Sequence, residues 1–280
     1  MAAYSYRIVN VFTQGHSPLS GNPLCVFEKA QGLDTARMQA LALQFNLSET
    51  TFILPSEKAS AAVRIFTPEY EMQFAGHPTL GTAHVCRALG LGGDRLTLEM
   101  PAGVIPVRAS GDRWTLQANP ATWREVPEPR LTLAAMLGLE QRDIGERPLW
   151  VNAGKEFLIV PLTSEAAVRR ANVRVDLLGQ LHSLDGHSMA YVFAPAGAGL
   201  LARFFFPQGR AVREDPATGA AVASLGGWCL ATGRTLPLEF DISQGEYVGR
   251  PSALRLQVNE QRHILVSGDV IELGRGWVEL

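Results

Sequence analysis

Cysteine is scarce in this chain, and both long apolar runs and blocks of one charge sign are lacking. The three cysteines, Cys25, Cys86 and Cys229, are odd in number and widely spaced, which argues against a disulfide framework. Lys and Arg number 25 against 27 acidic residues, so we expect neither nucleic acid nor a membrane as a partner. No apolar run reaches the roughly 18 residues of a membrane span, and no secretion signal is evident at the amino terminus. We therefore expect a cytoplasmic protein.

The chain is rich in strand-like segments that surround two long, apolar, small-residue segments. Its 280 residues, 46% apolar and 19% charged, suit one large globular domain or two smaller ones. Helices are predicted for 78–90 and from Pro216 onward, and the proline-rich segment 120–130 is the best linker. We predict an α+β fold with two halves, 1–119 and 131–280, each a mixed sheet curled around a central helix. Whether the last strand, "GWVEL", returns to the first half stays open.

Two short matches suggest that the halves arose by duplication. "RIFTP" at 64–68 matches "RFFFP" at 203–207, and "HPTLGTA" at 77–83 matches "DPATGAA" at 215–221. The offsets between the halves, 139 and 138 residues, are almost equal, as expected for an internal repeat. On this alignment His77 and Asp215 occupy corresponding positions.

The second match, "HPTLGTA" and "DPATGAA", lies at a predicted helix start in each half. A proline in the first turn after a polar residue is a typical start signal, which suits Asp215 as a cap. The unpaired N–H groups of such a turn attract a carboxylate or phosphate. We expect the two turns to form two walls of one site in a cleft between the halves. The alternatives are that Asp215 is only a cap and that His77 is only a buried hydrogen-bonding residue.

Two other interpretations of the histidine segment are rejected. "GHPTLGT" has the outline of a phosphate-binding loop but lacks the lysine that reaches the phosphates. His77 and His84 lie seven residues apart, and no third ligand stands nearby in a metal-binding pattern, so a zinc site is not expected.

Glu49, in "NLSETTFIL", stands where an amphipathic helix gives way to an apolar strand. It is either a solvated loop acid or a partly desolvated carboxylate at the edge of a cleft. The second environment suits a general base that takes a proton from a weakly acidic carbon. The residues alone leave both interpretations open.

Five segments together resemble the phenazine-biosynthesis isomerase (PhzF-like) family, in the expected order along nearly the whole chain. They are "VNVFTQGHSPLSGNPLCVF", "NLSETTFIL", "RIFTPEYEMQFAGHPTLGTAHV", "EDPATGAAVASL" and "QGEYVGRPS". The resemblance implies the fold of diaminopimelate epimerase, with two pseudo-symmetric domains and an active site between them. It also implies a reaction that uses neither cofactor nor metal.

The resemblance assigns roles to particular residues. Glu49 is implied as the general acid and base that moves a proton between carbons of a dihydro-hydroxyanthranilate. His77 and Asp215 are implied to bind or protonate the substrate. The implied substrate-binding residues are Gly76, Thr218, Gly219 and Ala220.

The chain departs from related patterns at two places. The family usually carries a serine where this chain has Ala220, so a hydroxyl that could bind the substrate is missing. The related racemases use a pair of cysteines at the helix starts, whereas Ala75 precedes Gly76 and no cysteine lies between 214 and 223. A two-thiol racemase is therefore disfavoured.

We predict an isomerase that moves a proton within a small carboxylate substrate, with a homodimer as a possible assembly. The first alternative is a non-catalytic module that binds a small acidic metabolite, which Ala220 favours. The second is a dimeric scaffold with an unused cleft. The environment of Glu49 discriminates between catalysis and binding.

Overall fold

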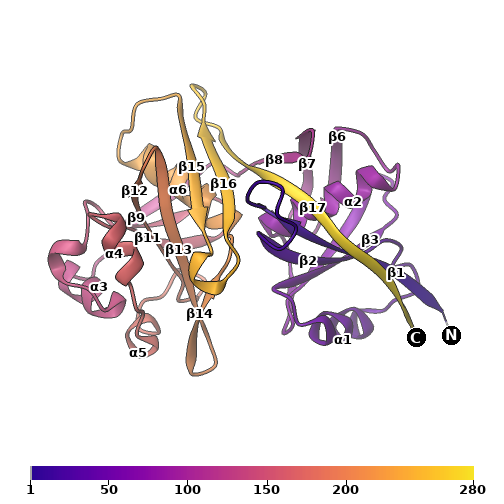
Figure 1. Cartoon of the computed structure of the whole chain (residues 1–280), viewed down its shortest axis with the longest axis horizontal. Coiled ribbons are helices and arrows are strands. Elements are labelled where there is room, and N and C mark those ends of the chain that lie inside the picture. Colours follow the sequence, from indigo (N-terminus) through magenta and orange to yellow (C-terminus); the bar gives the residue numbers. More distant parts are fainter. Residues whose placement is uncertain (1) are drawn as a thin grey trace. The chain divides into compact units, whose positions relative to one another are not determined.

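The computed structural model describes residues 2–280, which divide into two compact units (Figure 1). Unit 1 holds the chain up to Gln117 together with Ser267–Leu280, and unit 2 is Ala118–Val266. Each unit has one helix of 13 residues that is largely buried among its own strands.

The strands of unit 1 pair in a closed ring. They are β1 (Ala3–Val11), β2 (Asn22–Phe27), β3 (Glu49–Leu54), β4 (Ala61–Phe66), β5 (Glu71–Met72), β6 (Arg95–Met100), β7 (Gly103–Ser110), β8 (Arg113–Gln117) and the unit 1 part of β17 (Ile264–Glu279). The ring runs β17–β1–β2–β3–β4–β6–β7–β8 and returns to β17, with parallel pairing in β2–β3 and β4–β6. Closure removes exposed edges from these eight strands.

Helix α2 (Gly76–Ala88) is the central helix of unit 1 (Figure 1). It packs against β1, β2, β3, β4, β6 and β8. The approach is close because small residues line the helix: a Cβ on Gly81 would lie 2.6 Å from the Leu24 side chain. Helix α1 (Thr35–Phe45) begins at the side-chain cap of Asp34 and packs its apolar face, which includes Met38, on a separate cluster.

Unit 2 is built from a second mixed sheet. Its strands are β9 (Thr122–Glu125), β10 (Leu149–Asn152), β11 (Glu156–Pro161), β12 (Ala190–Ala196), β13 (Gly199–Gln208), β14 (Ala211–Asp215), β15 (Leu238–Gln244) and β16 (Ser252–Val258). They pair in the order β9–β10–β11–β12–β13–β15–β16, and β14 forms a hairpin with β13. The β11–β12 and β13–β15 pairs are parallel.

One long helix and several short ones complete unit 2. The short ones are α3 (Arg130–Leu137), α4 (Glu165–Arg170), α5 (Val175–Leu178) and the 3₁₀ turns η1 (Gln141–Asp143) and η2 (Glu246–Val248). The long helix α6 (Gly219–Ala231) packs against β9, β10, β11 and β16. A Cβ on Gly227 would lie 2.6 Å from Ala121 and 2.7 Å from Val151, so this helix also depends on small residues for its approach.

Two expectations about chain organisation are settled by the strand pairing. Residues 122–125, assigned above to a linker, form β9, which pairs with β10. Backbone pairing outweighs the proline-rich composition here because the prolines at 120, 127 and 129 flank the strand. The last strand belongs with the first half, since β17 pairs with β1 from Ala3↔Glu279 to Val11↔Val270. Within residues 2–280, no helix is both long and apolar enough to cross a membrane.

Candidate active site

Glu49 is the first residue of β3 and is mostly buried. Helix α1 ends at Asn46, which adopts the left-handed conformation, and three residues later Glu49 lies beside Leu24 of β2 in the parallel pair. The Glu49 side chain is 15% exposed. The interpretation of Glu49 as a solvated loop acid is therefore wrong, and a partly desolvated carboxyl is what the structure contains.

His77 lies in the first turn of α2 and contacts Glu49. Its Nε2 is 3.3 Å from Oε2 of Glu49, and only 6% of the residue is exposed. Burial lowers the pKa of His77 to about 3, against an opposing effect of the hydrogen bond that the Pro23 carbonyl accepts from the ring. The imidazole is therefore neutral at ordinary pH. The structure brings together two residues that the sequence placed on separate elements.

Asp215 ends β14 and is tied to the turn that follows it. Its Oδ2 accepts a hydrogen bond from the Thr218 hydroxyl at 2.6 Å. Its main-chain carbonyl accepts one from the Gln244 side-chain amide at 2.8 Å, and the same amide donates to the Thr218 hydroxyl at 3.1 Å. Gln244 is 2% exposed, so its amide is shielded from water while it holds the half-buried Asp215 and Thr218 in one arrangement.

Gln244 and Gly245 were not predicted as site residues, although "QGEYVGRPS" was one of the recognised segments. Gly245 has φ +81°, and a Cβ there would lie 2.5 Å from the Pro216 carbonyl oxygen. The segment therefore buttresses the turn between Asp215 and α6. Its place among the recognised motifs was the signal that pointed to it.

An arginine pairs with a glutamate on the hairpin that leads toward each central helix. In unit 2, Arg203 binds Glu214, the neighbour of Asp215, with the shortest contact at 2.7 Å. Its guanidinium also donates to the Ala171 carbonyl at 2.7 Å and lies over the Tyr247 ring. In unit 1, Arg64 of "RIFTP" binds Glu71 in the same manner. The arginines of the two matching segments thus both fix hairpins.

The alignment of His77 with Asp215 is wrong. Helix α2 begins at Gly76, so His77 is its second residue, whereas α6 begins at Gly219, beyond Pro216 and Asp215. Counted from the first helical residue, the counterpart of His77 is Ala220. Asp215 does not cap α6 either: the cap position is Thr218, whose hydroxyl bonds Asp215 instead of the helix. Pairing of Asp215 with Phe204 keeps it in the strand and delays the helix start.

The helix starts carry small residues, as predicted. Gly76 and Gly219 are buried first residues, and Ala220 is half-buried. The cysteines lie far from these starts: Cys86 and Cys229 are each the eleventh residue of their helix, and burial raises the pKa of each thiol to about 12. Such thiols are protonated and unreactive.

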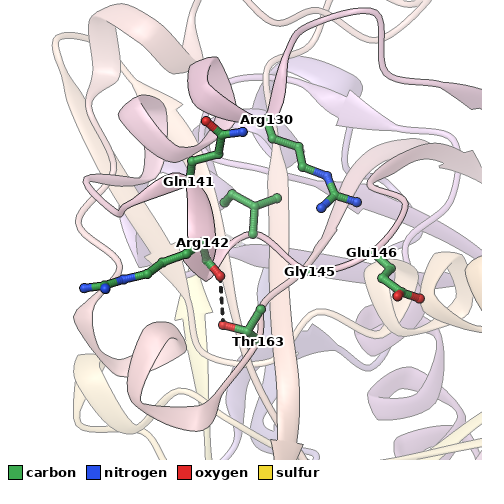
Figure 2. Close-up of a pocket in the computed structure, with 7 residues that line it drawn as sticks. Arg130, Gln141, Arg142, Gly145, Glu146 and Thr163 are labelled. Atoms are coloured by element: carbon green, nitrogen blue, oxygen red, sulfur yellow. Dashed lines mark hydrogen bonds between the residues drawn. The ribbon is translucent and has the colours of Figure 1, made fainter.

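Within residues 2–280, no three His, Cys, Asp or Glu side chains gather into a group that could hold a metal ion. Unit 2 contains a cavity of about 570 Å³ (Figure 2). It is lined by Arg130, Gln141, Arg142, Ile144, Gly145, Glu146 and Thr163. The Thr163 hydroxyl turns to the Arg142 carbonyl, and none of the predicted site residues lies there.

Comparison with known proteins assigns the chain to a family. The sequence profile of the PhzC-PhzF family, described as phenazine biosynthesis-like protein, matches residues 9–275. An uncharacterized isomerase of Pasteurella multocida is 38% identical, over 99% of this chain and 94% of that protein. The trans-2,3-dihydro-3-hydroxyanthranilate isomerase of Pseudomonas aeruginosa is 36% identical, over 90% of this chain and 89% of that protein.

Solved structures share the fold. A PhzF-family phenazine biosynthesis protein of Bacillus anthracis superposes with a TM-score of 0.89 at 23% identity, covering all of both chains. A probable proline racemase of Agrobacterium radiobacter gives 0.68 at 13% identity, over 99% of this chain and 93% of that one. These relatives define the chain as an isomerase, and its fold is shared with a racemase. The chain belongs to the phenazine biosynthesis-like (PhzC-PhzF) family.

Proposed function

We propose that this isomerase moves a proton between two carbons of a small carboxylate substrate, without a cofactor, and that Glu49 carries the proton. The observation that supports this most directly is the buried contact between Glu49 and His77, 3.3 Å long. A carboxyl group that is largely withdrawn from water and placed beside a neutral base is suited to taking a proton from carbon and returning it.

The proposed reaction has two proton transfers. In the first, a C–H bond of the substrate breaks, the proton bonds to Glu49, and the electron pair spreads into the unsaturated system beside the carboxylate. In the second, the Glu49 O–H bond breaks and a new C–H bond forms at another carbon. No electrons are gained or lost overall, so the reaction needs no redox partner. Fixed N–H donors near the substrate carboxylate would stabilise the charge that develops.

The residues proposed to hold the substrate come from both units. In unit 1 the proposed contact is the backbone at Gly76, next to His77, which contacts Glu49. In unit 2 they are Asp215, Thr218, Gly219 and Ala220, which share the turn fixed by Gln244. We propose that the two halves are pseudo-symmetric.

The substrate class we propose is a cyclic or amino carboxylate. Relatives are named trans-2,3-dihydro-3-hydroxyanthranilate isomerase, so trans-2,3-dihydro-3-hydroxyanthranilate is the first candidate substrate. Ala220 replaces the serine that the family usually carries, so a substrate group that needs this hydroxyl would bind less well here. A less hydroxylated carboxylate is therefore also to be tested.

Incorporation of solvent deuterium tests the proposal. The wild type, Glu49→Gln and the matched control Glu57→Gln, an exposed glutamate, are each incubated in heavy water with a panel of such carboxylates. We expect carbon-bound deuterium with the wild type and the control but not with Glu49→Gln. Exchange that persists in Glu49→Gln would contradict the role of Glu49 and direct attention to His77 or Asp215.

One observation favours a second function, the binding of a small acidic metabolite without catalysis. Ala220 occupies the position that corresponds to His77 in the other unit, so the second helix start lacks a side chain able to move a proton. Calorimetry separates the two functions: ligands that bind tightly but never exchange deuterium would support a binding protein.

A further inference from the structure

The two nitrogens of the His77 ring have different neighbours, and this identifies its tautomer. The ring donates a hydrogen bond to the Pro23 carbonyl, which can only accept. Nε2 is buried and has no hydrogen bond with good geometry, although it lies 3.3 Å from Oε2 of Glu49. The hydrogen bond to Pro23 therefore uses Nδ1.

The proton count follows from this assignment. A neutral imidazole has one N–H group, and in His77 it is on Nδ1. Nε2 then carries a lone pair, and that lone pair faces a carboxyl oxygen of Glu49. An ionised Glu49 would place two lone pairs against each other, whereas a protonated Glu49 can donate to Nε2.

We propose that His77 is a positioning residue. The Pro23 carbonyl fixes its Nδ1–H tautomer, and its Nε2 accepts a hydrogen bond from the protonated carboxyl oxygen of Glu49. This inference rests on the proposed function of Glu49 and gives His77 a role other than binding or protonating the substrate. His77 stabilises the proton-loaded form of Glu49, the form present between the two transfers. A base whose protonated form is stabilised takes a proton more readily from a weakly acidic carbon.

Several charged groups on the strands around α2 form ion pairs of their own. These pairs are Arg7 with Glu28 and Glu272, Arg64 with Glu71, and Glu99 with Lys58. His84, on the same helix, has its pKa lowered by burial and by Arg87. Glu49 is the carboxyl group that contacts His77.

Mutation of Pro23 is not informative, because the carbonyl that accepts the hydrogen bond belongs to the main chain. The protonation of the two nitrogens of the His77 ring is therefore measured directly. Nitrogen-15 NMR of imidazole-labelled protein distinguishes the Nδ1–H from the Nε2–H tautomer for each of the six histidines. We expect one histidine to stay neutral and Nδ1–H from pH 5 to 9, and its Nε2 signal to move in Glu49→Ala. An Nε2–H tautomer, or an Nε2 signal that ignores Glu49→Ala, would overturn the inference.

Kinetics give a second test that separates positioning from substrate binding. In His77→Leu, which cannot accept a hydrogen bond, we expect kcat for deuterium exchange to fall about 10- to 100-fold. KM should stay within about threefold, and the acidic limb of the kcat profile should move to lower pH. A raised KM with unchanged kcat would show that His77 binds substrate and would overturn the inference.

Failure of this inference is distinguishable from failure of the proposed function. If the wild type exchanges no compound in the panel, the isomerase proposal fails for those compounds, while the NMR test of the tautomer still stands. If the wild type exchanges deuterium and the tautomer is wrong, only the role of His77 is lost. Should His77→Leu not fold, the NMR comparison of the wild type with Glu49→Ala decides.

Discussion

Single residues that are buried together with their partners stabilise both units and shape the proposed site. Glu49 with His77 and Arg203 with Glu214 are such pairs, and each lies within one unit. Their contributions differ in kind. The first pair is neutral or shares one proton, whereas the second is a charged pair whose desolvation is compensated by several hydrogen bonds.

The buried neutral His77 makes stability depend on pH. Its pKa is about 3 in the folded protein and about 6.5 when exposed, so the unfolded chain binds the proton first as the pH falls. The stability associated with a neutral His77 is fully present above pH 6.5 and is lost progressively as the pH falls toward 3. At pH 5 the loss in unfolding free energy is about 2 kcal/mol.

Urea unfolding at pH 7.5 and pH 5 checks this dependence in the wild type, His77→Gln and His16→Gln, an exposed histidine. We expect His77→Gln to lose less stability than the wild type between the two pH values, and His16→Gln to follow the wild type. Parallel losses in all three proteins would contradict the burial of a neutral imidazole.

Replacing Arg203 tests the charged pair. Arg203→Met leaves the Glu214 carboxylate buried without its cation, so we expect a loss of about 3–5 kcal/mol in unfolding free energy. The matched control is Arg255→Met, which breaks a more exposed pair with Glu239 in the same unit and should cost about 0–1 kcal/mol. Chemical denaturation measures both. Equal losses would show that Arg203 is no more than a surface ion pair.

At the scale of elements, the turn between β14 and α6 is shaped by a distant segment. Gln244 bonds both Asp215 and Thr218, and Gly245 packs on the Pro216 backbone. This explains why the sequence predicted the start of α6 at Pro216, whereas the helix begins at Gly219. A proline in the first turn usually marks a start, but here Pro216 belongs to a turn held by β15.

Two glycine variants separate backbone strain from this contact. Gly245 and Gly249 both have positive φ, +81° and +66°, but a Cβ at Gly249 meets nothing within 4 Å. We expect Gly249→Ala to cost about 1 kcal/mol from the left-handed conformation alone. Gly245→Ala should cost about 2 kcal/mol more and should also slow deuterium exchange. Similar melting temperatures and exchange rates for the two variants would contradict the buttressing role of Gly245.

Sequence patterns predicted the elements better than their pairing. The small-residue composition of α2 and α6 predicted buried helices because only glycine and alanine let strands approach this closely, as at Gly81 and Gly227. The β9 strand was missed because its pairing with β10 is not visible in its proline-flanked sequence. The return of β17 to β1 joins residues more than 250 positions apart, which no local pattern encodes.

At the scale of the whole molecule, the site residues could be predicted one by one, but their relations could not. Glu49 and His77 were recognised through separate motifs, and their contact depends on β3 and α2 packing in one ring. The predicted correspondence of His77 with Asp215 is wrong because it rests on similar residue types. Alignment of the first helical residues, Gly76 and Gly219, pairs His77 with Ala220 instead. The two units therefore present different chemistry at their helix starts: an imidazole in one and the methyl group of Ala220 in the other.

The role of Glu49 as the proton carrier is measured on a ligand whose binding is followed at the same time. A carboxylate that exchanges deuterium with the wild type is given to Glu49→Gln, and its Kd and its exchange rate are measured on the same sample in heavy water. We predict an almost unchanged Kd and an exchange rate lowered at least about 100-fold. Exchange at the wild-type rate with the ligand bound would contradict the account.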